Sequence, residues 1–292
     1  MYYILALLTG AFISSLIVMN GGLAATYGLY SSMVILHFIG LLPILFLVWY
    51  KNETPFSSKY PLPLYFGGAC NALVILLASY AYRHLSVSAI LALGLLGQSV
   101  AGTLLDQFGF FQVPKYPITR NKILSLILLL AGALLMMDGF VLRPVLLAFT
   151  GGILFVISRT LNARFATLTN TTLCTFYHYG IGLILSILAF LFFGASEISY
   201  PEFGMTPFSP NWYIYFGGIV GILVIFLGNL TVLKISALSL TLLIFIGQVT
   251  TGMSLDLVRM QEPPSPGLFI GVIFITFGLL ANLFLGRTKM AK

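Results

Sequence analysis

The chain has 292 residues, of which 59% are hydrophobic and only 7% are charged, and its mean hydropathy is +1.05. Soluble domains carry about 25% charged residues, so this composition excludes a soluble fold and indicates an integral membrane protein. The formal net charge of +7 does not indicate nucleic-acid binding, because the basic residues are spread between apolar segments rather than clustered.

Ten apolar runs follow one another along the chain, each near the length of about 20 residues that a helix needs to cross a bilayer. They lie at residues 3–26, 31–50, 62–82, 86–106, 121–140, 144–166, 171–195, 211–232, 236–257 and 266–286. The runs are continuously apolar, whereas the strands of a membrane β-barrel alternate between apolar and polar residues. The predicted fold class is therefore an all-α integral membrane protein with ten transmembrane helices.

Basic residues are divided unevenly between the two sides of these spans. Ten lie on the side of the N-terminus, and only three lie on the other side: Arg83, Arg143 and Arg259. Because basic connections are retained in the cytoplasm, both termini are predicted to be cytoplasmic. We find no organellar transit peptide and therefore expect a multi-pass protein of a bacterial inner membrane.

Two similar segments lie 150 residues apart, "LGQSVAGTLLDQ" at 96–107 and "IGQVTTGMSLDL" at 246–257. At the same offset, residues 65–106 and 215–256 are identical at 15 of 42 positions, which include a Gln, an Asp and four Gly. Shared hydrophobicity cannot produce identical polar residues and glycines, so the chain is predicted to contain an internal repeat.

The repeat extends to the first span of each half at a slightly different offset. The corresponding pairs are Gly10 with Gly152 and Asn20 with Asn162. The predicted units are residues 1–141 and 142–292, with five spans each. Because five is odd, the second unit must cross the membrane in the opposite direction to the first. Inverted repeats of this kind are typical of secondary transporters, which bind substrate near the midplane between the repeats.

The motifs "YFGG" and "GQxxxGxxLD" followed by "QFGFF", with five spans per unit, resemble the YdcZ-like family of the drug/metabolite transporter superfamily in a tandem, two-copy form. The resemblance implies a ten-helix carrier that exports a small metabolite or drug-like solute, with proton coupling as one option. It also implies that the third, fourth, eighth and ninth spans line a central cavity. The second copy departs from the family after Asp256, where "LVRMQEPPSPG" replaces an aromatic loop.

Two glutamines lie near the middle of the fourth and ninth spans, at Gln98 and Gln248. One interpretation is a pair of amides on either side of a midplane substrate site, which the resemblance also implies. The alternative is that they join helices, because amides form hydrogen bonds between membrane helices. Asn20 and Asn162 leave the same two interpretations open.

Two aspartates lie about 12 Å further along the same helices, near the span ends, at Asp106 and Asp256. They are expected either to pair with nearby bases, Lys115 and Arg259, or to couple protonation to gating. Two histidines, His37 and His178, occupy roughly equivalent places in the second and seventh spans. Each is interpreted either as a proton relay for coupling or as a hydrogen-bonded packing residue.

Arg159 is the one basic residue predicted to lie away from the ends of a span, and the first unit has only apolar residues at the matching place. Three interpretations remain open for it. Its side chain reaches the cytoplasmic surface, or pairs with Asp106 at similar depth, or binds an anionic substrate.

No metalloprotease, P-loop, nucleophile-elbow or dinucleotide motif occurs in the sequence. We therefore expect no cofactor, no metal site and no enzymatic activity, and the predicted function is secondary active transport. The alternatives are a membrane-embedded enzyme acting on lipid precursors, or a channel. The expected partners are a small-molecule substrate and membrane lipids but no nucleic acid. A monomeric functional unit is expected, with a dimer as the alternative.

Overall fold

The computed structural model describes residues 1–56, 59–110, 118–137, 141–194, 208–232, 237–260 and 265–284. Within these residues the chain forms ten α-helices. They are α1 (Tyr2–Tyr27), α2 (Leu29–Tyr50), α3 (Phe66–Tyr82), α4 (Val87–Phe108), α5 (Arg120–Leu135), α6 (Leu142–Leu168), α7 (Thr171–Phe193), α8 (Gly217–Val232), α9 (Ala237–Met260) and α10 (Pro266–Phe284). Short 3₁₀ turns, η1 (Leu62–Tyr65) and η4 (Trp212–Phe216), precede α3 and α8.

Six segments of the described chain are long and apolar enough to cross a membrane. They are Tyr2–Tyr27, Leu29–Tyr50, Leu62–Tyr82, Val87–Leu105, Leu142–Leu168 and Thr171–Phe193, and two shorter apolar helices lie at Trp212–Gly228 and Pro266–Ala281. All six coincide with predicted spans, so the all-helical, multi-pass class is confirmed.

Polar residues at the helix ends explain where several helices begin. The Ser86 hydroxyl accepts a hydrogen bond from the amide of Ala89 at 3.1 Å, and the Asn170 side chain accepts one from Leu173 at 2.9 Å. Such caps satisfy backbone amides that have no partner within the helix. At its other end α4 stops at Gly109, whose positive φ of 68° suits glycine.

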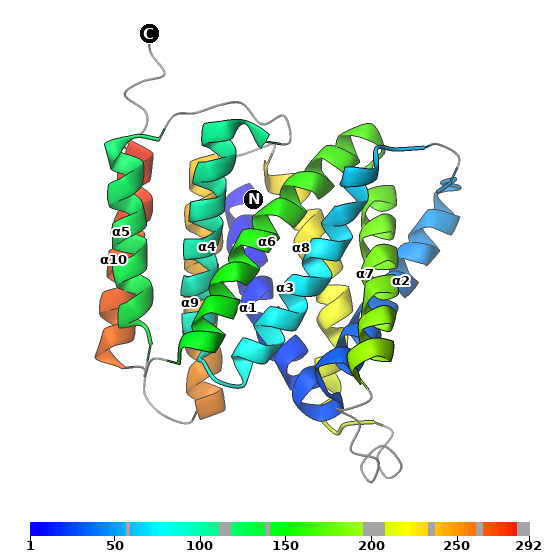
Figure 1. Ribbon diagram of the computed structural model, residues 1–292, viewed down its shortest axis with the longest axis horizontal. Coiled ribbons are helices and arrows are strands. Elements are labelled where there is room, and N and C mark those ends of the chain that lie inside the picture. Colours follow the sequence, from blue (N-terminus) through cyan, green and yellow to red (C-terminus); the bar gives the residue numbers. More distant parts are fainter. Residues whose placement is uncertain are drawn as a thin grey trace.

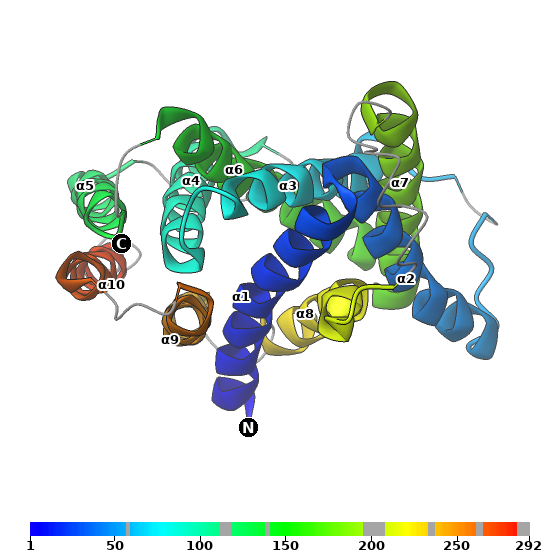
Figure 2. The ribbon, with the colours of Figure 1, turned by 90° about the horizontal axis from the view of Figure 1, so that it is seen from below.

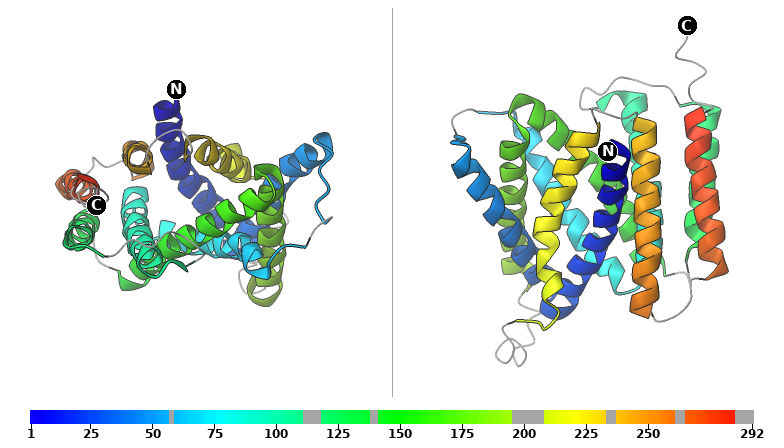
Figure 3. Two further views of the ribbon diagram at one scale, coloured as in Figure 1. Left: turned by 90° about the horizontal axis from the view of Figure 1, so that it is seen from above. Right: turned by 180° about the vertical axis from the view of Figure 1, so that it is seen from behind.

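The helices stand side by side, and α1 begins at the same end of the bundle at which α10 ends (Figure 1). We call this end the termini side and the other end the opposite side. Seen from below, α5 and α10 form one edge of the bundle, α2 and α7 form the other, and α1 crosses obliquely between them (Figure 2). From behind, α1 lies between α8 and α9 (Figure 3).

The helix contacts are duplicated when the first five helices are exchanged with the last five. The contact of α1 with α9 corresponds to that of α6 with α4, and the contact of α1 with α8 corresponds to that of α6 with α3. The exchange replaces α5 by α10 and α2 by α7, so the contacting pairs α5–α10 and α2–α7 are each unchanged by it. The internal repeat of the sequence is therefore also present in the packing.

Glycines allow the closest of these approaches. A Cβ added to Gly10 of α1 would collide with the backbone of Ile244 and Gln248 in α9. A Cβ added to Gly152 of α6 would collide with the backbone of Gly94 in α4. Small residues of this kind let membrane helices approach closely, since lipid supplies little hydrophobic force to join them.

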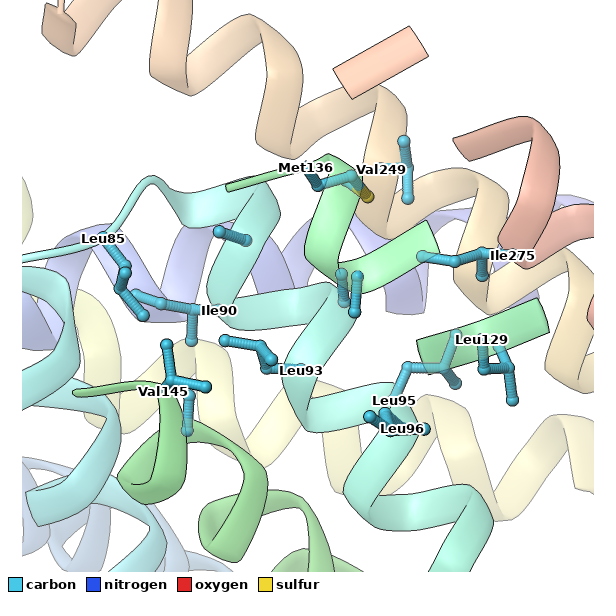
Figure 4. Close-up of a cluster of buried hydrophobic side chains, with 14 of the residues drawn as sticks. Leu85, Ile90, Leu93, Leu95, Leu96, Leu129, Met136, Val145, Val249 and Ile275 are labelled. Carbon is cyan, nitrogen blue, oxygen red and sulfur yellow. The ribbon is translucent and has the colours of Figure 1, made fainter. Parts of the chain in front are cut away.

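The largest apolar cluster lies beside α4, where it joins α4, α5, α6, α9 and α10 (Figure 4). Leu93 and Leu96 of α4 contribute to it, together with Leu129 of α5, Val249 of α9 and Ile275 of α10. This cluster fixes α4 and α9 between the α5–α10 edge and the crossing helices α1 and α6.

Candidate functional site

Arg159 lies on the inner side of α6. One neighbour in sequence, Ser158, donates a hydrogen bond to the carbonyl of Gly67 in α3 at 2.7 Å, while Val156 packs against α4. At 100° per residue, Arg159 falls between these two directions and away from Leu146, which is exposed on the outer face. Although the Arg159 side chain is directed inward, it is exposed. This exposure therefore does not arise from the lipid-facing surface of α6.

The described part of the chain gives Arg159 one close partner, the ring of Phe155, whose centroid is 5.9 Å from the guanidinium carbon. A contact at this distance is a weak cation–π interaction. The side chain of Asp106, which was the expected ionic partner, lies outside the described residues, as does Lys115, the expected partner of Asp106.

Asn162 belongs to a hydrogen-bond network between α3, α6 and α7. Its amide nitrogen lies 2.8 Å from His178 Nδ1 and 3.3 Å from Ser158 Oγ. An amide nitrogen only donates, so Asn162 is the donor in both contacts. Ser158 Oγ can accept because its own proton goes to the Gly67 carbonyl. His178 Nδ1 is then an acceptor, and its proton is on Nε2. The network joins helices, which favours the packing interpretation of Asn162.

Asn20 occupies the corresponding place in α1. Its Oδ1 packs against Gly217 of α8, as the Oδ1 of Asn162 packs against Gly67 of α3. Asn20 Oδ1 is buried and accepts no hydrogen bond from the described residues. Both asparagines therefore fill equivalent helix crossings, although only Asn162 has a polar network around it.

His37 is fully buried between α2 and α7. Its Nδ1 lies 2.8 Å from the Met33 carbonyl and 3.0 Å from Ser186 Oγ, and Ser186 donates its proton to the Gly182 carbonyl. Both neighbours of Nδ1 are therefore acceptors, so Nδ1 carries the proton of the neutral ring. These contacts are those of a packing histidine.

The two histidines lie close to, but not at, equivalent positions of the repeat. The His37 ring packs against Gly182, and the Tyr179 ring packs against Gly40, which is the same contact shifted by 142 residues. The counterpart of His37 is therefore Tyr179, and His178 is one residue away from the equivalent position. The roughly equivalent places predicted for the two histidines are therefore one residue apart.

Gln98 and Gln248 differ in their surroundings. Gln248 is buried, and its backbone carbonyl accepts a hydrogen bond from the Ser14 hydroxyl of α1 at 2.6 Å. Gln98 is only partly buried. Gly252 follows Gln248 by four residues, and a Cβ added to it would lie 3.0 Å from Leu91 Cδ1 of α4. Gly102 follows Gln98 by four residues, and a Cβ added to it would meet no described atom within 4 Å. Gln248 shares with Gly252 the face of α9 that is directed toward α4, and Gln98 lies two helical turns from Leu91 on the same face of α4. Helical register thus directs each glutamine toward the other helix.

Asp256 is buried with both carboxylate oxygens occupied. Oδ1 accepts a hydrogen bond from the amide of Val87 at 2.7 Å, and Oδ2 accepts one from Ser88 at 2.9 Å. These amides belong to the first turn of α4, where the helix dipole also favours a negative charge. A carboxylate of α9 therefore caps a helix of the other half.

Arg259 was expected to pair with Asp256, but the structure gives it different partners. Its guanidinium donates to the carbonyls of Leu85 at 3.2 Å and Tyr82 at 2.5 Å, and lies 3.8 Å from the centre of the Tyr82 ring. Arg259 and Asp256 thus hold the same connection between α3 and α4. Arg259 binds backbone carbonyls of this connection, and Asp256 binds backbone amides.

The opposite side is more tightly packed than the termini side. Gly21 is buried beneath the Tyr82 ring, whereas its counterpart Ala163 is exposed. Leu91 is buried, whereas its counterpart Thr241 is exposed. On the opposite side α1 packs against α3 and α4. The exposure of Arg159 belongs to this less tightly packed side.

An apolar, all-helical chain with duplicated helix packing belongs to the class of multi-pass membrane proteins. The family model described as "Putative inner membrane exporter, YdcZ" matches the chain twice, at residues 1–135 and 143–281. The protein therefore belongs to this family, as a tandem of two repeats, and is a multi-pass inner-membrane protein. A solved crystal structure shares the fold at a TM-score of 0.64 and 18% identity, covering 98% of this chain and 96% of the other. None of the curated proteins matches the chain.

Proposed function

We propose that the protein is a secondary carrier that exports a small metabolite or drug-like solute by alternating access. In this proposal its ten helices are ten spans, arranged as two inverted repeats at residues 1–141 and 142–292, with both termini in the cytoplasm. The duplicated contacts of the described helices support the repeat. The uneven distribution of basic residues supports the orientation.

The observation that carries the proposal is the unequal packing of two sides that derive from the same repeat. Gly21 and Leu91 are buried on the opposite side, whereas their counterparts Ala163 and Thr241 are exposed on the termini side. A carrier that exchanges two conformations must close one side while the other is open, and inverted repeats supply the two arrangements. The conformation described here then faces the cytoplasm. A channel would need a continuous path across the membrane, and the packed opposite side argues against such a path.

The substrate site in this proposal lies between α4, α6 and α9. Gln98 is partly buried on the face of α4 directed toward α9, and Arg159 is exposed on the inner side of α6. An amide offers donors and an acceptor, and a guanidinium offers a charged fork that suits carboxylates and phosphates. The pair therefore suits a polar solute with an anionic group. Asn162, Asn20 and the two histidines are used in helix packing and have supporting roles.

Counterflow in proteoliposomes tests the transport function. Liposomes containing the purified protein are incubated in a defined mixture of small metabolites, and their contents are measured by mass spectrometry. A carrier gives saturable uptake that is accelerated when the same solute is preloaded inside. Flux that rises linearly with concentration, without acceleration by internal solute, would indicate a channel. Chemical conversion of a solute would indicate an enzyme.

A further inference from the structure

The contacts of α9 on the opposite side form one connected set. The Asp256 carboxylate accepts hydrogen bonds from the amides of Val87 and Ser88. Three residues further along, one turn of helix, the Arg259 guanidinium donates to the carbonyls of Tyr82 and Leu85. The connection between α3 and α4 is thus held on both sides by side chains that belong to the other repeat.

The same connection holds the end of α1. The Tyr82 ring, which carries the Arg259 guanidinium on one face, lies directly against Gly21 of α1. Arg83 donates a hydrogen bond to the carbonyl of Ala24 at 2.9 Å. Asp256 and Arg259 therefore tie together α9, the α3–α4 connection and α1. These are the elements that close the opposite side.

We propose that Asp256 and Arg259 are the latch of the gate on the opposite side, and that this gate opens only when their contacts with residues 82–88 are released. The proposal rests on alternating access as described above. The hydrogen bonds of Asp256 are charged and buried, and such bonds are strong, so their loss shifts an open–closed equilibrium substantially. The function of this motif in the second repeat is thus to stabilise the state that faces the termini side.

The repeat supplies the reporters for a test. Ile17 of α1 is the counterpart of Arg159, and it is half-buried while Arg159 is exposed. If the opposite side opened as the termini side is open now, Ile17 would become exposed. Ala163 reports separately on the termini side, where it is now exposed.

The experiment measures modification of Ile17→Cys and Ala163→Cys by a charged, membrane-impermeant thiol reagent in oriented vesicles. Both native cysteines, Cys70 and Cys174, are replaced by alanine. In the otherwise unchanged protein, Ala163→Cys should react from the termini side and Ile17→Cys should react slowly from the opposite side. Asp256→Ala and Arg259→Gln should each raise the rate at Ile17→Cys about tenfold or more, and lower the rate at Ala163→Cys.

The matched control is Ser86→Ala, which removes the side-chain cap of α4 on Ala89 while Asp256 and Arg259 are retained. An equal increase in Ser86→Ala would indicate fraying of α4 and would overturn the latch. Unchanged rates in both Asp256→Ala and Arg259→Gln would overturn it as well. Arg259→Lys keeps the charge but not the geometry that binds two carbonyls, so it separates the effect of charge from that of the hydrogen bonds. Size-exclusion elution checks that each variant is folded. The labelling needs no substrate, so it can fail while counterflow succeeds, and the reverse.

Discussion

Polar side chains inside the helices separate into two groups by what satisfies them. Asn162 and His178 bond each other between α6 and α7, the His37 ring contacts Ser186 of α7, and Asp256 accepts from backbone amides of α4. Burial without such partners would be costly, so these residues primarily hold helices together. Gln98 and Arg159 are different, because both retain exposure on inward-directed faces. At the scale of single residues they are the best candidates for contact with a substrate.

The first prediction concerns the exposure of Arg159. In a protein without native cysteines, Arg159→Cys should react with a charged thiol reagent from the termini side, because the residue is exposed away from lipid. Ile157→Cys is the matched control, since Ile157 lies three helical turns from the exposed Leu146 on the same outer face and at nearly the depth of Arg159, and a charged reagent does not enter lipid there. Equal rates at the two positions would show that Arg159 does not face water.

The second prediction concerns the glutamine pair. Gln98→Leu should weaken substrate binding by about 1–3 kcal/mol, roughly ten- to hundred-fold, because it removes a hydrogen-bonding partner and leaves the solute unsatisfied. Gln248→Leu should have the smaller effect on the state that faces the termini side, because Gln248 is buried there. The measurement is the half-saturation concentration in counterflow. An equal loss in both variants, or none in Gln98→Leu, contradicts the assignment.

Helix crossings determine how closely the two repeats approach. The crossings of α1 with α9 and of α6 with α4 both depend on a glycine placed against the backbone of the partner helix. The cap from Asp256 to α4 adds a polar contact between helices of different repeats. At the scale of elements, the molecule is thus held by tight crossings in the middle and by specific contacts at one side.

The third prediction tests the crossing of α6 with α4. Gly152→Ala should destabilise the protein by about 1–3 kcal/mol, because the added methyl group collides with the backbone of Gly94 and the helices must separate. Gly180→Ala in α7 is the control, since no described atom lies within 4 Å of its added Cβ. There the exchange should stabilise the helix by about 0.5–1 kcal/mol. Thermal unfolding in detergent measures both, and destabilisation of equal size would contradict the prediction.

The whole molecule combines a symmetric plan with an asymmetric conformation. The helix pairs repeat when the halves are exchanged, whereas the burial of equivalent residues does not. The proposed alternating access would account for both facts, because a symmetric plan allows two equivalent states and a single conformation occupies one of them. In the proposed orientation the less tightly packed side faces the cytoplasm.

The fourth prediction tests that orientation. Lys59→Cys, exposed on the termini side, should be protected from an impermeant maleimide in intact cells and react after permeabilisation. Pro210→Cys, exposed before η4 on the opposite side, should react in intact cells. The reversed pattern would place the termini outside the cytoplasm and reverse the direction of the proposed conformations. The repeat itself would be unaffected.

The sequence alone determined the class of the protein, since a chain with 7% charged residues and long apolar runs cannot fold as a soluble domain. It also determined the repeat, because identical Gln, Asp and Gly at a constant offset do not arise from hydrophobicity. Only the tertiary structure decided which partners the polar residues have. Asp256 binds the amides of α4 rather than Arg259, and His37 corresponds to Tyr179 rather than His178. The physical reason is that these partners lie on helices distant in sequence. Their choice depends on how the helices cross and rotate, which no local spacing encodes.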